Sequence, residues 1–174
     1  MFIRMLAVIR MNKTDKSKHN ISVASIKRST MKPYDFKWTK FYESNLDFPY
    51  SGLNLGLAEN ELIICSTVVD AENYSILTSQ KLITSENGTE SIGNLVNAKD
   101  KGYGDFKGYK DDSLTFGLVE LENGTELKYF IETGKASMIM IHGVRTLIRT
   151  QQMTDKNIEN VTRIRNRKNE QNEK

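Results

Sequence analysis

Side chains that commonly catalyse reactions or bind metals are few in this sequence and lie far apart. Its 174 residues include one cysteine, Cys65, and two histidines, His19 and His142. Structural zinc ligands usually occur in close pairs, about two to five residues apart, and no such pair is present. We therefore expect no metal site. Cys65 follows the apolar run Leu62-Ile63-Ile64, so it is expected to pack as a small hydrophobic side chain.

Carboxylates are the remaining candidates for acid–base chemistry. Asp105, Asp111 and Asp112 lie in a glycine-rich stretch, and Asp100 precedes it. Their setting indicates solvated loop carboxylates, with a small carboxylate-dependent enzyme as an alternative. The sequence contains no Gly-x-Ser-x-Gly motif and no glycine-rich dinucleotide turn. The run Gly134–Ser137 lacks the upstream glycine of a phosphate loop, since position 129 is Tyr. We assign no catalytic residue and no cofactor, and favour a protein that is not an enzyme.

Basic side chains gather at the two ends of the chain. Residues 1–40 carry ten Lys or Arg against two Asp, whereas residues 41–153 carry nine basic and sixteen acidic side chains. A basic arm attracts nucleic acid or anionic lipid, or folds back onto the acidic body of its own protein. The candidate contacts in this arm are Lys13, Lys16, Lys18, Lys27, Arg28 and Lys32.

Five aromatic residues fall within nine positions after this arm. Tyr34, Phe36 and Trp38 alternate as on a strand, whereas Trp38, Phe41 and Tyr42 fit one face of a short helix. Both alternatives place the segment in a flap over the core, which we assign to residues 33–56. The possible partner-binding surface consists of Tyr34, Phe36, Trp38, Phe41 and Tyr42.

Strand patterns dominate the middle of the chain. Residues 61–69 are apolar and β-branched and predict a buried strand, followed by a turn at 70–73 and strands at 74–78 and 81–84. Two Asn-Gly pairs predict hairpins, because the tight type I′ turn needs positive φ at both central residues. The first pair is Asn87-Gly88, and the second, Asn123-Gly124, joins strands predicted at 114–121 and 126–131. Residues 91–97 are a candidate further strand, and residues 102–109 are either a bulged strand or a loop.

A helix is predicted from Thr133 onward, where the apolar period changes from two to 3.6 residues. Thr133 is its expected N-cap, and Gly143 inside it predicts close approach to a strand. The inward stripe is Met140, Val144, Leu147 and Ile148, with Arg145 and Arg149 on the opposite side.

The fold expected from these elements is α+β and mainly β: a curved antiparallel sheet or partly open barrel, capped by one C-terminal amphipathic helix. We expect a loosely ordered basic arm at 1–32, a domain at 33–153 with its closing helix at 134–153, and a polar, fraying basic tail at 154–174. Residues 1–10 are either a short amphipathic anchor or an upstream extension.

The central segment resembles bacterial pleckstrin-homology-like (PH-like) domains. It shares a Glu before the first strand, here in Glu59-Asn60-Glu61, and then Ile76-Leu77-Thr78 and Leu82-Ile83, with Lys81 where arginine is usual. The resemblance covers about residues 57–152 and implies a curved antiparallel sheet closed by one helix. It also implies phosphoinositide binding through the first strand loop in some members, but here that loop, residues 70–73, is acidic and would repel phosphate.

The leading functional hypothesis is a non-enzymatic, cytoplasmic interaction domain. We expect it to bind a protein partner through a sheet edge or through the surface around residues 34–50. The first alternative is binding of nucleic acid or an anionic membrane through the basic arm. The cytoplasmic location is expected because a single cysteine forms no internal disulfide and suits a reducing compartment.

Overall fold

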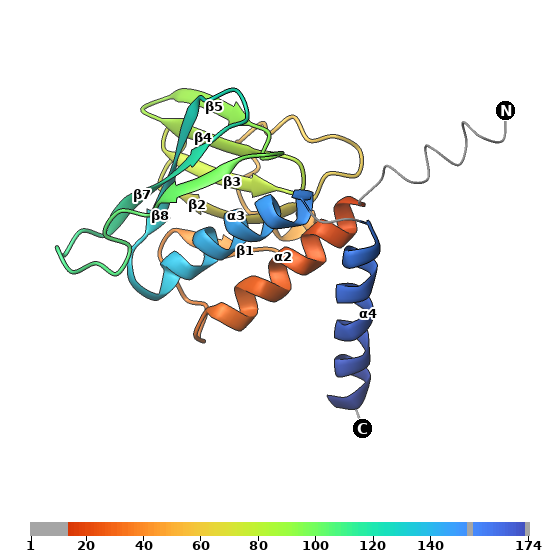
Figure 1. Ribbon diagram of the computed structural model, residues 1–174. Helices are drawn as coiled ribbons and strands as arrows, with labels where there is room; N and C mark the ends of the chain where they lie inside the picture. Colours follow the sequence, from red (N-terminus) through yellow and green to blue (C-terminus); the bar gives the residue numbers. More distant parts are fainter. Residues whose placement is uncertain (1–13, 153–154, 173–174) are drawn as a thin grey trace, which may run out of the picture.

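The computed structural model describes residues 14–152 and 155–172. Within these residues two antiparallel sheets are covered on one side by two of the three helices, while the third extends away from the sheets (Figure 1). The helices are α2 (Asp15–Ser29), α3 (Ser137–Gln152) and α4 (Asp155–Asn172), and two short 3-10 helices are η1 (Asn45–Asp47) and η2 (Gly134–Ala136). The strands are β1 (Thr39–Phe41), β2 (Ile63–Val68), β3 (Tyr74–Thr78), β4 (Leu82–Glu86), β5 (Thr89–Gly93), β6 (Lys99–Gly102), β7 (Leu114–Glu120) and β8 (Glu126–Glu132).

The first sheet has the order β1-β2-β3-β4-β5, and the second has the order β6-β7-β8. The two sheets do not join into a closed barrel. Instead β8 crosses the first sheet, and the Phe130 amide donates to the Ser75 hydroxyl oxygen of β3 at 2.8 Å. The predicted α+β, mainly β fold with a partly open sheet is therefore confirmed.

Both Asn-Gly hairpins are present, but their turns differ. Asn87 and Gly88 have φ of 51° and 81°, as a two-residue type I′ turn requires, and they join β4 to β5. At the second hairpin only Gly124 has positive φ, 85°. There the Leu121 amide donates to the Thr125 carbonyl at 2.8 Å, so the turn is longer than the predicted two-residue one.

Helix α3 presents the predicted stripe of Met140, Val144, Leu147 and Ile148 to the core, where all four are buried. Gly143 permits the predicted close approach, since a Cβ atom there would lie 2.8 Å from the Cys65 sulfur on β2. Thr133 occupies the N-cap position of η2, which leads into α3, but its side chain makes no capping hydrogen bond. Its hydroxyl donates to the Asp112 carbonyl at 2.6 Å, which ties the helix start to the preceding loop.

The prediction of a loose arm is wrong for residues 15–29, which form helix α2. Thr14 caps it by accepting a hydrogen bond from the Ser17 amide, and Val23 and Ile26 are buried in the core that α3 also lines. The helix forms because packing against α3 compensates for its weak apolar periodicity. Lys13 and residues 1–10, for which an arm contact and an anchor or extension were predicted, lie outside the described residues.

The predicted tail contains helix α4, and the Arg165 guanidinium donates to the Asn20 carbonyl of α2 at 2.6 Å.

A second apolar cluster lies on the opposite face of the first sheet. Strand residues such as Ile76 and Ile83 are fully buried there beneath Phe48, Tyr50 and the leucines of segment 53–57. This segment has no regular strand of its own. Residues 53–56 belong to the predicted flap, and together with Leu57 they cover the face of the sheet that the helices leave open.

Candidate functional site

Of the aspartates considered for chemistry, Asp105 and Asp100 use their carboxylates to hold nearby groups of the chain. The Asp105 carboxylate accepts hydrogen bonds from the amides of Tyr109 and Lys110, at 3.3 and 2.8 Å. Asp111 has a positive φ of 62°, and the backbone carbonyl of Asp112 holds Thr133. Asp100 accepts from the Tyr103 hydroxyl at 2.6 Å. Among the described residues, no group of three or more His, Cys, Asp or Glu side chains could hold a metal ion.

Cys65 and His19 are both buried. Desolvation raises the pKa of the Cys65 thiol well above its usual range, which keeps it protonated and unreactive. His19 Nε2 lies 2.8 Å from the Tyr42 carbonyl oxygen and so joins α2 to the chain after β1. These contacts are structural.

The aromatic segment packs inward more than the sequence indicates. Tyr42 is only 2% exposed and its hydroxyl pairs with Ser66 at 2.6 Å, so its assignment to a partner-binding surface is wrong. Phe36 and Phe41 pack against the main core. The backbone amides of Lys37 and Trp38 donate to the two oxygens of the Glu132 carboxylate, both at 3.0 Å. Tyr34, Phe36, Trp38 and Phe41 are half-buried, and their role as a contact surface stays a prediction.

The basic candidates are spread along and beyond α2. Lys16 is exposed and Lys18 half-buried, while Lys27 forms an ion pair with Glu43. Arg28 is exposed at the end of α2, and Lys32 Nζ lies 6.0 Å from the centre of the Tyr34 ring. They lie on ordered structure, and no single site collects all of them.

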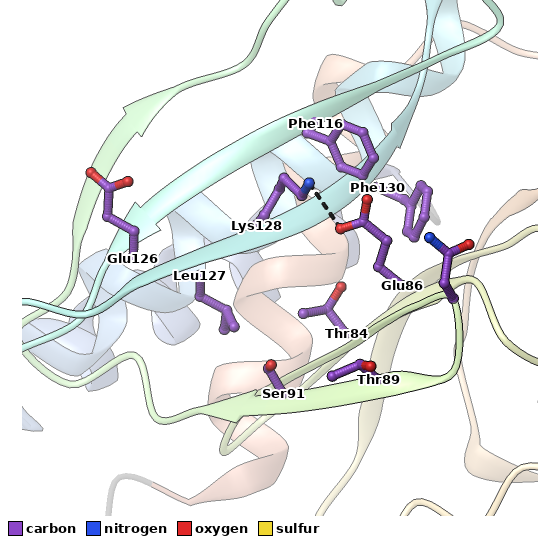
Figure 2. Close-up of a pocket in the computed structure, with 10 residues that line it drawn as sticks. Thr84, Glu86, Thr89, Ser91, Phe116, Glu126, Leu127, Lys128 and Phe130 are labelled. Atoms are coloured by element: carbon purple, nitrogen blue, oxygen red, sulfur yellow. Dashed lines mark ion pairs between the residues drawn. The ribbon is translucent and has the colours of Figure 1, made fainter.

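A groove between β8 and the β4–β5 hairpin is the clearest candidate site (Figure 2). Its volume is about 400 Å³, within the range of small ligand and peptide sites. One wall consists of side chains from alternate positions of β4 and β5, and the other of side chains from β7 and β8. The lining residues are Thr84, Glu86, Asn87, Thr89, Ser91, Phe116, Glu126, Leu127, Lys128 and Phe130.

Strand β8 presents an unpaired edge to this groove. In an antiparallel pair, hydrogen-bonded residues alternate with residues whose amide and carbonyl groups point away from the partner strand. The Leu121–Thr125 hydrogen bond sets this phase for β7 and β8, and it directs the backbone groups of Glu126, Lys128 and Phe130 outward. The Phe130 amide donates its hydrogen bond to the Ser75 hydroxyl oxygen. The backbone groups of Glu126 and Lys128 have no hydrogen-bond partner within the described part of the chain.

One ion pair and two aromatic rings give the groove its chemistry. Lys128 Nζ lies 2.8 Å from a carboxylate oxygen of Glu86 and 4.3 Å from the centre of the Phe116 ring. The Phe116 and Phe130 rings lie 4.8 Å apart. Figure 2 shows Lys128 and Glu86 meeting across the groove, with both rings on one side and Thr84, Thr89 and Ser91 on the other.

The β4–β5 hairpin that forms the lower wall is fixed from behind. The Tyr74 hydroxyl donates to the Glu90 carboxylate at 2.6 Å, and burial together with Glu90 raises the pKa of Tyr74 to about 12. Tyr74 therefore stays protonated and the hydrogen bond persists at neutral pH. The wall is held in place before any ligand arrives.

The lining of the groove is rich in groups suited to binding. It has hydroxyls, backbone donors and acceptors, one ion pair and two rings, but no histidine or cysteine to activate a serine or threonine. Sequence reasoning missed this site. The one sequence feature that indicated it was Lys128, a charged residue between apolar neighbours on a predicted strand. The β4–β5 hairpin that faces this strand lies about forty residues earlier in the sequence, so the sequence pattern did not connect the two.

Comparisons of this chain with family models, with curated proteins and with solved structures found no match. No helix among the described residues has both the length and the apolar character needed to cross a membrane.

Proposed function

We propose that this protein is a non-catalytic interaction domain that binds an extended segment of a protein partner along β8. The observation that carries the proposal is the unpaired backbone of Glu126 and Lys128 at the side of a preformed groove. An extended segment adds to such an edge by main-chain hydrogen bonds, and its alternate side chains enter the flanking pockets.

The walls of the groove suit the two faces of such a segment. Apolar side chains would contact Phe116 and Phe130, whereas polar ones would meet the hydroxyls of Thr89 and Ser91 on β5. The Lys128–Glu86 pair is about half exposed, so both charges remain available to rearrange around a ligand.

We further propose a PH-like relationship, supported by the order of the elements. A four-strand meander, β2 to β5, precedes a three-strand meander, β6 to β8, and then helix α3. Strand β1 and helix α2 would be additions to that arrangement. Asp70 in the acidic β2–β3 loop accepts hydrogen bonds from the amides of Glu72 and Asn73, which favours a structural turn rather than phosphate binding. A cytoplasmic location belongs to the same proposal.

The test is selection of random peptides of about twelve residues, displayed on phage, against the intact chain. Ser91→Trp would fill the groove, because Ser91 is exposed on the wall that faces β8. Ile92→Trp is the matched control. Ile92 is the next residue of the same strand, its side chain lies on the opposite face of the sheet, and it is 53% exposed.

Selected peptides should bind Ser91→Trp at least about tenfold more weakly, because the tryptophan would block access to both walls of the groove and to the edge of β8. They should bind Ile92→Trp with unchanged affinity. Equal binding to both variants, or failure to enrich any peptide, would contradict the proposal.

A further inference from the structure

The helical side and the sheet side of this protein carry opposite charge. Helices α2 and α3 contain six Lys or Arg and a single acidic residue, Asp15. Residues 39–132, which form both sheets, contain seven basic and sixteen acidic side chains. Figure 1 shows α2 and α3 lying side by side on one side of the sheets. The two sides of the molecule are therefore separate binding environments.

The one carboxylate on α2 and α3, that of Asp15, forms hydrogen bonds with the connection between β3 and β4. Asp15 accepts hydrogen bonds from the Ser79 hydroxyl at 2.7 Å and from the Gln80 side-chain amide at 3.1 Å. It lies at the start of α2, whereas Arg28 lies at the other end of that helix. No acidic side chain of α2 or α3 therefore neutralises the basic residues near Arg28.

Four basic side chains gather where the end of α2 meets α3. His142, Arg145 and Arg149 follow at three- and four-residue spacing and share one face of α3. Arg28 lies two residues after Ile26, whose Cδ1 atom would be 3.4 Å from a Cβ atom at Gly143, the neighbour of His142, so the end of α2 meets α3 at this point. Burial, and then the charges of Arg145, Arg149 and Arg28, lower the pKa of His142. Arg28 and Arg149 are exposed, and neither forms an ion pair with another described residue. We call Arg28, His142, Arg145 and Arg149 the basic cluster.

Arg145 shows that the cluster is partly fixed in position. Its guanidinium donates to the Tyr103 hydroxyl at 2.8 Å and lies 3.6 Å from the Asp100 carboxylate. Arg145 also stacks near the Tyr103 ring, 5.4 Å from its centre. Arg28 and Arg149 are exposed, and no described residue holds their guanidinium groups in this way.

The chemistry of the cluster matches a phosphodiester backbone. Guanidinium groups bind phosphate through paired N–H donors, which a lysine ammonium cannot reproduce. From His142 to Arg149 the helix rises about 10 Å, and duplex nucleic acid presents about six phosphate charges over that length. Tyr103, which lies beside the cluster, is half-buried and Arg145 lies near its ring, so this ring is not free to stack on a base; this favours a duplex over a single strand.

We propose that the basic cluster on α2 and α3 is a second binding surface, which contacts the phosphate backbone of double-stranded nucleic acid without reading its sequence. It lies on the helices and not on the peptide groove, so the two surfaces act independently. The contact would position this domain, together with a partner bound at β8, on a duplex.

The test measures fluorescence anisotropy of a labelled duplex of about 20 base pairs, titrated with the full chain at several salt concentrations between about 50 and 200 mM. Arg28→Glu and Arg149→Glu should each weaken binding at least about fivefold. Each should also reduce the slope of log affinity against log salt by the amount expected for the loss of about one phosphate contact. Circular dichroism melting checks that each variant is folded.

Lys40→Glu is the matched control, because it makes the same change in net charge. Lys40 is exposed and alternates on β1 with Thr39 and Phe41, so it lies on the face of the sheet opposite to α3. The affinity of the Lys40→Glu variant for the duplex should stay within about twofold of that of the wild type.

Three results would overturn the proposal. One is an equal loss of affinity in Lys40→Glu, which would indicate net charge alone. Another is tighter binding to a single strand of the same length than to the duplex. The third is binding to vesicles with about 30% phosphatidylserine that exceeds duplex binding and responds to the same reversals, since this would assign the cluster to a membrane surface.

Discussion

Replacing Gly143 by alanine places a methyl group between α3 and the first sheet. The added Cβ would lie 2.8 Å from the Cys65 sulfur and 3.1 Å from Leu77 Cδ2, and both side chains are fully buried. Alanine gains about 1 kcal/mol over glycine in a helix, but overpacking a closed core costs about 1–3 kcal/mol. We expect the second effect to win, with a net loss of up to about 2 kcal/mol in the free energy of unfolding.

A double-mutant cycle with Cys65→Ala separates the two effects. Removing the buried sulfur alone should cost about 1 kcal/mol, as removal of one buried heavy atom commonly does. In that background the nearest obstacle to the Gly143→Ala methyl group is gone, so Gly143→Ala should become neutral or stabilising. Urea unfolding followed by circular dichroism would give a coupling of about 1–2 kcal/mol. Effects that add within about 0.5 kcal/mol would refute the packing argument.

Three further predictions concern single side chains. Tyr129 is fully buried and its hydroxyl has no partner among the described residues, so Tyr129→Phe should raise the free energy of unfolding by about 1 kcal/mol in urea titration; a loss would mean that the hydroxyl is satisfied. Glu132→Ala should free the amide of Trp38 and shift the emission of this single tryptophan to the red, with a cost of about 1–3 kcal/mol; unchanged emission would contradict this. The lowered pKa of His142 means that its neutral form stabilises the fold above about pH 6.5 and that this stability is lost as the pH falls. Arg149→Gln should raise that pKa in an NMR titration, and an unchanged value would place Arg149 away from the cluster.

Local signals predicted the hairpins and the closing helix. Asn87 and Gly88 force their turn through backbone conformation alone, and the strands on either side of Gly124 alternate clearly. The stripe that contains Val144 is periodic enough to give both the helix and its buried face. In these elements the decisive interactions lie within a few residues along the chain.

Helix α2 was missed because its decisive interactions are not local. Between Asp15 and Ser29 its apolar side chains are few and partly β-branched. Val23 and Ile26 stabilise the helix only because they pack in the core that α3 also lines. The Thr14 cap, Asp15 in the first turn and basic residues in the last turn were the available signals. Tyr42 was misplaced for a similar reason, since its partner Ser66 lies on another strand.

The groove could not be derived from the sequence because crossing strands create it. Lys128 and Glu86 meet only after β8 crosses the first sheet, and nothing local to either residue indicates that contact. The free edge of β8 also depends on the hydrogen-bonding phase that the turn at Leu121–Thr125 sets. The basic cluster likewise needs two helices that are more than a hundred residues apart.

The binding of an extended peptide to the open edge of β8 can be tested by amide hydrogen exchange. The exchange rate of each residue would be measured in the free protein and with a selected peptide bound. We expect the amides of Glu126 and Lys128 to exchange rapidly in the free protein and to become strongly protected in the complex, while the amide of Leu127 is protected in both. Slow exchange of Glu126 and Lys128 in the free protein, or no change when the peptide binds, would contradict an open strand edge at β8.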